Sequence, residues 1–180
     1  PNFYLMRHPI YITTPQVSES EATVNVQVEM ACYTNQKTLK TELVITDAAG
    51  NEVARQTEDL VFNRKMRTCE YPLKEVKLTN PKLWDCEHPH LYTAKVTIYH
   101  ENGEVADCVT ERFGVRSLEF SPKFGMKLNG KKILLKGIAN HHSLGALGSA
   151  AYPRAIEKRI QMLKEFGVNH IRTSHNPYSE

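Results

Sequence analysis

The stretch that decides the fold runs from Ile133 to Pro177 and reads ILLKGIANHHSLGALGSAAYPRAIEKRIQMLKEFGVNHIRTSHNP. Its apolar opening, residues 133–138, has almost no polar interruption, which is typical of a strand buried on both faces. Residues 152–166 then change to a helical period, and residues 168–172 return to a strand pattern. Strand, helix and strand in this order predict a βαβ unit with two parallel strands and a right-handed crossover.

The helix of this unit has recognisable ends and two distinct faces. Pro153 suits a first helical turn, and Gly167 suits a cap at the C-terminus. The apolar and the polar side chains separate at helical spacing. The apolar face carries Ile156, Ile160 and Leu163, with Phe166 close to it, and the opposite face carries Glu157, Arg159 and Lys164.

Polar side chains gather where each of the two predicted strands ends. The first strand ends in Asn140-His141-His142, and the second ends in Arg172-Thr173-Ser174-His175-Asn176-Pro177. In α/β barrels the functional residues cluster at the carboxyl ends of the parallel strands. His can bind the hydroxyls of a polar ligand, and Arg can orient a catalytic carboxylate through two hydrogen bonds. The alternative is that these residues only cap the rim of the sheet.

Two other kinds of site could use the same residues. A zinc site would need several His ligands, but His141 and His142 are adjacent on a strand and face opposite ways, and no HExxH motif occurs. A nucleophilic Ser would need a hydrogen bond to its base, which Ser174 cannot normally make to the adjacent His175 in an extended chain. The sequence therefore predicts neither a metal nor a cofactor.

Residues 9 to about 116 read as short strands separated by turns, without a helix pattern. One segment alternates strictly, with Val24, Val26, Val28 and Met30 between polar residues. About seven strands are predicted, at residues 10–13, 23–30, 39–46, 52–60, 74–78, 92–98 and 105–115. Their number and spacing fit an immunoglobulin-like β-sandwich. A hairpin around Asn129-Gly130 is predicted at residues 126–133.

Composition excludes two classes of partner. The net charge is only +3, and basic residues alternate with acidic ones, so neither a nucleic acid nor a membrane surface is expected as a partner. No apolar run approaches the roughly 18 residues that span a bilayer. The chain begins at Pro1 without Met and stops at Glu180 directly after a strand-like run, so we expect a piece of a longer protein.

Several motifs occur in order along nearly the whole chain, namely Asn80–Trp84, His88–Tyr92, Phe113–Arg116, Lys136–His142, Leu144–Gly148 and Ile171–Pro177. Together they resemble glycoside hydrolase family 2, which includes β-galactosidases, β-glucuronidases and β-mannosidases. The His-His and Gly-Ala-Leu-Gly combination is most similar to β-galactosidases. The resemblance implies a mainly β chain in which residues 1–117 form the immunoglobulin-like sandwich and residues 118–180 begin a (β/α)₈ (TIM) barrel that is incomplete here.

The resemblance also implies a function, namely hydrolysis of terminal β-linked sugars with retention by two glutamates. Both glutamates would lie beyond Glu180, so the chain alone is expected to be inactive. His141, His175 and Asn176 are expected to bind the sugar, and Arg172 to steady a catalytic carboxylate. Proteins of this family usually have Asp where Ser143 stands here, and the neutral hydroxyl of Ser143 cannot supply the same charge.

Other interpretations stay open. Asn51-Glu52 has the Asn-Glu form of the acid/base motif, but it lies in a predicted hairpin and is interpreted as part of a turn. The chain could instead be a non-catalytic scaffold or a carbohydrate-binding sandwich module, or belong to a β-glucuronidase or a β-mannosidase. The incomplete barrel would leave strand edges open, and self-association of the chain is expected through them.

Overall fold

The computed structural model describes residues 3–32, 38–61, 68–141, 143–150 and 152–175. The chain divides into two compact units, Pro1–Lys131 and Lys132–Glu180, which are considered separately. No helix among the described residues has the length and apolar character needed to cross a membrane.

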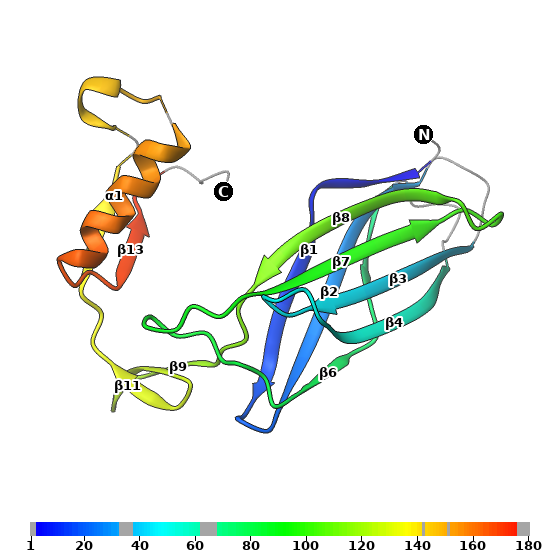
Figure 1. Cartoon of the computed structure of the whole chain (residues 1–180), viewed down its shortest axis with the longest axis horizontal. Helices are drawn as coiled ribbons and strands as arrows, with labels where there is room; N and C mark the ends of the chain where they lie inside the picture. The colour runs from blue at the N-terminus through cyan, green and yellow to red at the C-terminus, as the bar shows by residue number, and fades with distance from the viewer. Residues whose placement is uncertain (1–2, 33–37, 62–67, 142, 151, 176–180) are drawn as a thin grey trace. The chain divides into compact units, whose positions relative to one another are not determined.

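Two four-stranded antiparallel sheets make up most of the first unit (Figure 1). In one sheet the order is β1-β2-β5, with β6 also paired to β2, and in the other it is β4-β3-β7-β8. The strands are β1 (Phe3–Val17), β2 (Glu21–Cys32), β3 (Thr38–Thr46), β4 (Glu52–Val61), β5 (Thr68–Pro72), β6 (Val76–Thr79), β7 (Tyr92–Tyr99) and β8 (Val105–Phe113). The predicted sandwich is confirmed, with β5 as a strand that the sequence pattern did not predict.

The core of the sandwich lies between the two sheets and follows the alternation read from the sequence. Every second residue of β2 points inward, and Val24, Val28 and Met30 are fully buried. The facing sheet contributes inward side chains from β3 and β7, which include Leu43 and Ile98. Full burial of one such side chain contributes about 1.5–3 kcal/mol, so this two-sided core holds the sheets together.

Hydrogen bonds between the sheets close both sides of the sandwich. On one side the Leu5 N–H donates to Asp107 Oδ2 at 2.9 Å, and Thr14 Oγ1 donates to the Arg116 carbonyl at 2.7 Å. These bonds join β1 to β8 and to the segment after it. On the other side, Gln56 of β4 donates from Nε2 to the carbonyl of residue 74, before β6, at 3.0 Å. On each side, side chains of one sheet or its flanking segments thus bind backbone groups of the other.

A small three-stranded sheet follows the sandwich, in the order β11-β10-β9. Its strands are β9 (Leu118–Ser121), β10 (Gly125–Leu128) and β11 (Lys131–Ile133). The turn between β10 and β11 is the predicted Asn-Gly turn, with both residues in the left-handed region, at φ 50° for Asn129 and 75° for Gly130. The predicted hairpin is confirmed.

Asn129 also ties this hairpin to the sandwich. Its Oδ1 accepts from the Ser117 N–H at 2.9 Å, and its Nδ2 donates to the Trp84 carbonyl at 3.0 Å. The Trp84 ring lies below the Arg116 guanidinium, 4.8 Å from the ring centroid, and closely against Gly114, where an added Cβ would lie 2.7 Å from Trp84 Cγ. These five residues form one connected junction within the first unit.

The second unit contains the predicted strand, helix and strand. They are β12 (Gly137–Asn140), α1 (Pro153–Glu165) and β13 (His170–Thr173), with a short 3₁₀ helix, η1 (Gly145–Leu147), before α1. β12 and β13 pair in parallel, which confirms the predicted βαβ unit.

Both predicted helix ends are confirmed. Pro153 is the first residue of α1, and Gly167 has a φ of 78° just beyond its end. The Gly167 N–H donates to the Lys164 carbonyl at 2.9 Å and the Val168 N–H to the Leu163 carbonyl at 3.0 Å, which is the Schellman pattern.

The apolar run at residues 133–138 is not one strand buried on both faces, so that prediction was wrong. β11 ends at Ile133 and β12 begins at Gly137, and Leu134 in the link is 74% exposed. Asn169 explains the break, because its Nδ2 donates to the Leu134 carbonyl at 3.0 Å and its Oδ1 accepts from the Lys136 N–H at 2.8 Å. The side chain of Asn169 thus satisfies backbone groups that a neighbouring strand would otherwise bind.

Candidate functional site

The ends of β12 and β13 lie side by side in the second unit. The register pairs Gly137 with His170 and Asn140 with Thr173, and the Ser174 N–H donates to the Asn140 carbonyl at 3.2 Å. Because the two strands are parallel, the chain leaves both of them at the same edge of the sheet. The polar residues that follow the two strands are therefore neighbours, as predicted.

The two faces of this strand pair differ in what covers them. Ile138 and Ile171 are half-buried, and Asn140, which shares their face, accepts a hydrogen bond from Arg159 of α1, so α1 covers this face. The opposite face is exposed and is formed by Gly137, Ala139, His170 and Arg172. In a (β/α)₈ barrel the helices lie outside, so the exposed face is the one that would point to the barrel interior.

Two of the predicted substrate-binding residues meet at the edge of the sheet. The rings of His141 and His175 pack edge to face, with their centroids 5.8 Å apart and the ring planes at 62°. Both side chains are exposed. A neutral imidazole has one donor and one acceptor nitrogen, so the pair can bind neighbouring hydroxyls of one ligand.

Of the other two predicted residues, the structure describes Arg172 but not Asn176. Arg172 lies on the exposed face beside Ala139, and its side chain makes no hydrogen bond or ion pair to any described residue. Its guanidinium is thus available to a carboxylate supplied from elsewhere. Asn176 lies outside the described residues, so its predicted role stays a prediction.

His170 packs in a different way from the histidines at the strand ends. An added Cβ at Gly137 would lie 2.8 Å from His170 Cδ2, so the imidazole lies directly across the neighbouring strand. Only a glycine leaves room for this contact. His170 is therefore in contact with β12, below the strand ends, whereas His141 and His175 lie beyond them.

Sequence reasoning missed one residue that contacts this edge. Arg159 was assigned to the polar face of the helix, yet its guanidinium donates to Asn140 Oδ1 at 2.8 Å and to the His141 carbonyl at 3.3 Å. It also donates to the Ser143 carbonyl. The available signal was its spacing, because Arg159 follows Ile156 by three residues and so borders the apolar face.

The described strand ends carry neither a carboxylate pair nor a metal site. Residues 137–148 and 168–175 include no Asp or Glu. Among the described residues, no three His, Cys, Asp or Glu side chains are grouped to hold a metal ion. The exposed histidines can therefore bind a ligand, but these segments supply no general acid or carboxylate nucleophile.

Asn51-Glu52 belongs to the hairpin between β3 and β4, as interpreted from the sequence, with Asn51 at the end of the connection and Glu52 as the first residue of β4. Asp47 Oδ1 accepts from the Asn51 N–H at 2.9 Å, and Glu52 forms an ion pair with Arg55 at 2.6 Å. The hydrogen bond from Arg55 lowers the pKa of Glu52. A general acid near neutral pH needs a raised pKa, so Glu52 is unsuited to that role.

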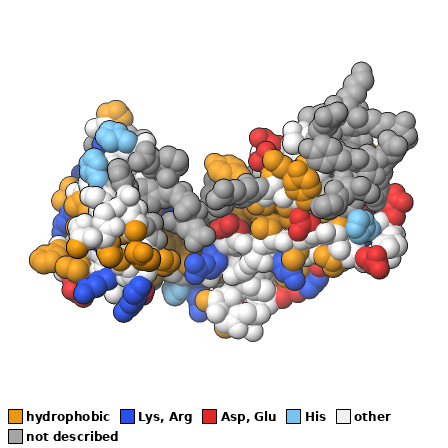
Figure 2. Space-filling view, turned by 90° about the horizontal axis from the view of Figure 1, so that it is seen from above, with side chains coloured by type: hydrophobic (Ala, Val, Ile, Leu, Met, Phe, Trp, Pro, Cys, Tyr) orange, Lys and Arg blue, Asp and Glu red, His pale blue; other side chains and the backbone are white. Residues whose placement is uncertain are grey.

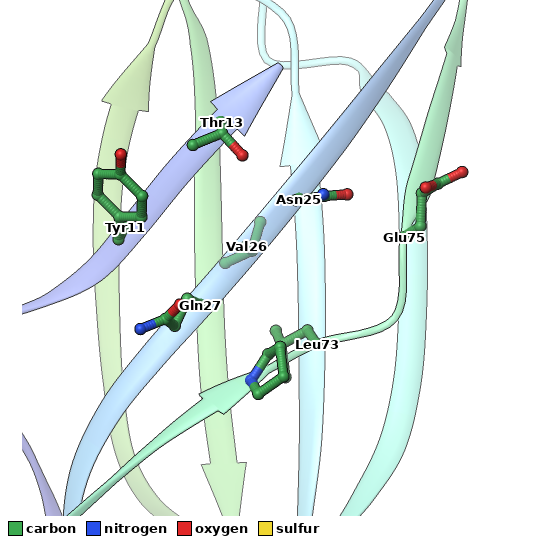
Figure 3. Close-up of a pocket in the computed structure, with 8 residues that line it drawn as sticks. Tyr11, Thr13, Asn25, Val26, Gln27, Leu73 and Glu75 are labelled. Atoms are coloured by element: carbon green, nitrogen blue, oxygen red, sulfur yellow. The ribbon is translucent and has the colours of Figure 1, made fainter. Parts of the chain in front are cut away.

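The sandwich has a surface pocket of about 350 Å³ on the outer side of the sheet that contains β1 and β2 (Figure 3). It lies where β5 ends and β6 has not yet begun, so Asn25 and Val26 of β2 are paired with β1 on one side and have no strand partner on the other. Tyr11, 67% exposed, contributes to its wall. The other lining residues are Thr13, Asn25, Val26, Gln27, Pro72, Leu73 and Glu75.

Two family models match the chain in succession. Residues 8–116 match the model of glycosyl hydrolases family 2, and residues 123–180 match the TIM barrel domain of the same family. Residues 117–122 lie outside both matches. The matches therefore do not test the predicted domain boundary between residues 117 and 118.

Relatives and solved structures agree with these matches. A putative β-glucuronidase of Formosa agariphila is 38% identical over 166 residues, which are 92% of this chain and 19% of that protein. The β-galactosidase BoGH2A of Bacteroides ovatus is 34% identical over 179 residues, covering 93% of this chain and 19% of its own length.

The crystal structure of a family 2 glycosyl hydrolase from Bacteroides cellulosilyticus superposes with a TM-score of 0.91 at 30% identity, over 98% of this chain and 22% of that one. The chain thus spans about a fifth of the length of these proteins. With two consecutive domain models matched and the fold shared along nearly its whole length, the chain belongs to glycosyl hydrolases family 2.

Proposed function

We propose that this chain is part of a retaining glycosidase that cleaves terminal β-linked sugars, with β-galactosides as the substrate class. The observation that carries the proposal is the meeting of His141 and His175 at the common edge of two parallel strands, 5.8 Å between ring centroids. The family membership supports the reaction class, and the β-galactosidases among the relatives support the sugar.

Each predicted residue has a role in this reaction. His141 and His175, together with Asn176, bind hydroxyls of the sugar at the strand ends. Arg172, exposed and without a partner among the described residues, orients one of the two catalytic carboxylates by a bidentate contact. Retention requires the two carboxyl groups about 5 Å apart, and both are supplied by other parts of the barrel.

The test compares two histidines of the same segment in the longer protein that contains this chain. His175→Ala should lower kcat/KM on an aryl β-galactoside by about 100-fold, because a hydrogen bond that strengthens in the transition state is lost. His170→Ala is the matched control and should have a much smaller effect, since His170 packs across Gly137. Equal losses would contradict the assignment of the strand ends.

Two further measurements test the reaction class and the sugar. The 180-residue chain alone should not turn over any aryl glycoside, because its strand ends lack a carboxylate pair. In the longer protein, β-galactoside, β-glucuronide and β-mannoside substrates should be compared side by side. A preference for the glucuronide would replace the galactoside proposal with the activity named for other relatives, and no turnover of any of them would refute the reaction class.

A second candidate function rests on the pocket of the sandwich. Tyr11 is an exposed aromatic side chain beside polar side chains, a combination that can bind a sugar ring without cleaving it (Figure 3). Binding of an oligosaccharide to the 180-residue chain, lost in Tyr11→Ala, would support a carbohydrate-binding module. Unchanged binding in Tyr11→Ala would exclude this pocket as the binding site.

A further inference from the structure

Arg159 reaches from the middle of α1 to the C-terminal end of β12. Its Nη1 donates to Asn140 Oδ1 at 2.8 Å and to the His141 carbonyl at 3.3 Å, while its Nη2 donates to the Ser143 carbonyl. One side chain thus holds three oxygen atoms, spread over the last residue of the strand and the turn that follows it.

The acceptors of Arg159 are all uncharged and lie at the end of β12 or just beyond it. Glu157 precedes Arg159 by only two residues, and side chains at this spacing do not face each other on a helix. Glu157 instead forms an ion pair with Arg154 at 2.7 Å and accepts from Gln161 Nε2. Arg159 is half-buried, whereas the Arg154 side chain is 79% exposed, so the two arginines of this helix have different surroundings.

The three contacts require the planar, forked shape of a guanidinium. Arg has five donors in fixed directions and stays charged at all relevant pH values, while the ammonium of Lys is a point charge with donors that rotate. By holding the His141 carbonyl, the guanidinium fixes the orientation of the backbone at this residue. The direction of the His141 side chain depends on that backbone, and so does its packing against His175.

We propose that Arg159 is a positioning residue for the sugar site, acting through His141; the proposal rests on the glycosidase function above. Arg159 does not touch the substrate. It holds the backbone of His141 in the orientation in which the imidazoles of His141 and His175 pack together. A displacement of about 1 Å at a reacting or binding group can cost about 100-fold in rate, so loss of the guanidinium should be visible in turnover.

The experiment uses the longer protein that contains this chain, with an aryl β-glycoside that the wild type cleaves. Arg159→Gln should lower kcat/KM by about 10- to 100-fold. Compared with Arg159→Gln, Arg159→Lys should restore the thermal stability of the protein but only part of kcat/KM. Lys restores the positive charge but lacks the forked guanidinium. Arg154→Gln is the matched control on the same helix and should stay within about twofold, as expected for an exposed ion pair.

A double-mutant cycle separates positioning from general damage to the fold. If Arg159 acts through His141, Arg159→Gln should cause little further loss of kcat/KM in a His141→Ala background, whereas a purely structural effect would reduce activity by the same factor in both backgrounds. If Arg159→Gln fails to fold, the cycle is run with Arg159→Lys.

Additive losses, or equal effects of Arg159→Gln and Arg154→Gln, would refute the role of Arg159 and leave the proposed function standing. A wild-type protein that cleaves no aryl β-glycoside would refute the proposed function, and this role with it.

Discussion

Replacing Asn129 should destabilise the first unit far more than its position in a short turn suggests. The side chain makes two hydrogen bonds, from the Ser117 N–H at 2.9 Å and to the Trp84 carbonyl at 3.0 Å, and the backbone has a φ of 50°. Each bond contributes about 0.5–1.5 kcal/mol net. A left-handed conformation costs about 1–2 kcal/mol for most residues, whereas Gly and Asn adopt it readily.

Two substitutions separate these contributions. Asn129→Gly tolerates the left-handed backbone and loses only the two bonds, so the free energy of unfolding should fall by about 1–3 kcal/mol. Asn129→Ala loses the bonds and adds the backbone strain, for a total of about 2–5 kcal/mol. Trp84 is the single tryptophan of the sequence and accepts one of the two bonds, so urea unfolding followed by its fluorescence reports on this junction.

Asn102 provides the control, because it bonds only to Glu104 in the exposed turn between β7 and β8. Asn102→Ala should change the free energy of unfolding by less than about 0.5 kcal/mol. The reasoning is refuted if Asn129→Gly has no larger effect than Asn102→Ala, or if Asn129→Ala is no worse than Asn129→Gly.

Three further predictions concern other parts of the chain. Gly137→Ala places a Cβ 2.8 Å from His170 Cδ2 and should weaken the β12–β13 pairing by about 1–3 kcal/mol, seen as faster amide exchange in β13 but not in β7. Hydrogen bonds from the N–H groups of His88 and Glu87 lower the pKa of Asp85 from its ordinary 3.8, so its contribution to stability is present above that pH and is lost as the pH falls through the lower folded value. Asp85→Asn should therefore cost stability at about pH 6 and not at about pH 2; an equal cost at both would contradict this. The 180-residue chain should self-associate in light scattering whereas residues 1–131 stay monomeric, because apolar side chains of the second unit are exposed (Figure 2). Phe166 is one of them and is 84% exposed. Monomeric behaviour of both chains would refute this prediction.

Local signals in the sequence were sufficient wherever one or two residues determine the backbone. Pro153 and Gly167 gave the ends of α1, and Asn129-Gly130 gave the hairpin. Strict alternation gave β2, because each inward position carries a large apolar side chain. The meeting of His141 and His175 also follows from the sequence, since parallel pairing brings the two strand ends together.

Other features depend on contacts between distant residues and left no local pattern. β5 is only five residues long and ends in Pro72, so it has too few alternating positions to be recognised. The apolar run at residues 133–138 was misread because Asn169, more than 30 residues away, binds its backbone. Arg159 looked like a polar surface residue because its acceptors are mostly carbonyl groups, which every residue has.

The closed side of the sandwich at β1 and β8 has a mechanical consequence. Leu5 is bonded to Asp107, and nine residues later Thr14 is bonded to Arg116, so both pairs are separated by 102 residues. The chain enters the sandwich through β1 and leaves it through β8, and these two strands therefore run in the same direction, side by side (Figure 1). A pull on the two ends of the sandwich would slide these segments past each other and load both hydrogen bonds at once, whereas antiparallel neighbours would open one bond at a time. Forced unfolding is governed by the unfolding rate, and this arrangement should keep that rate low under tension.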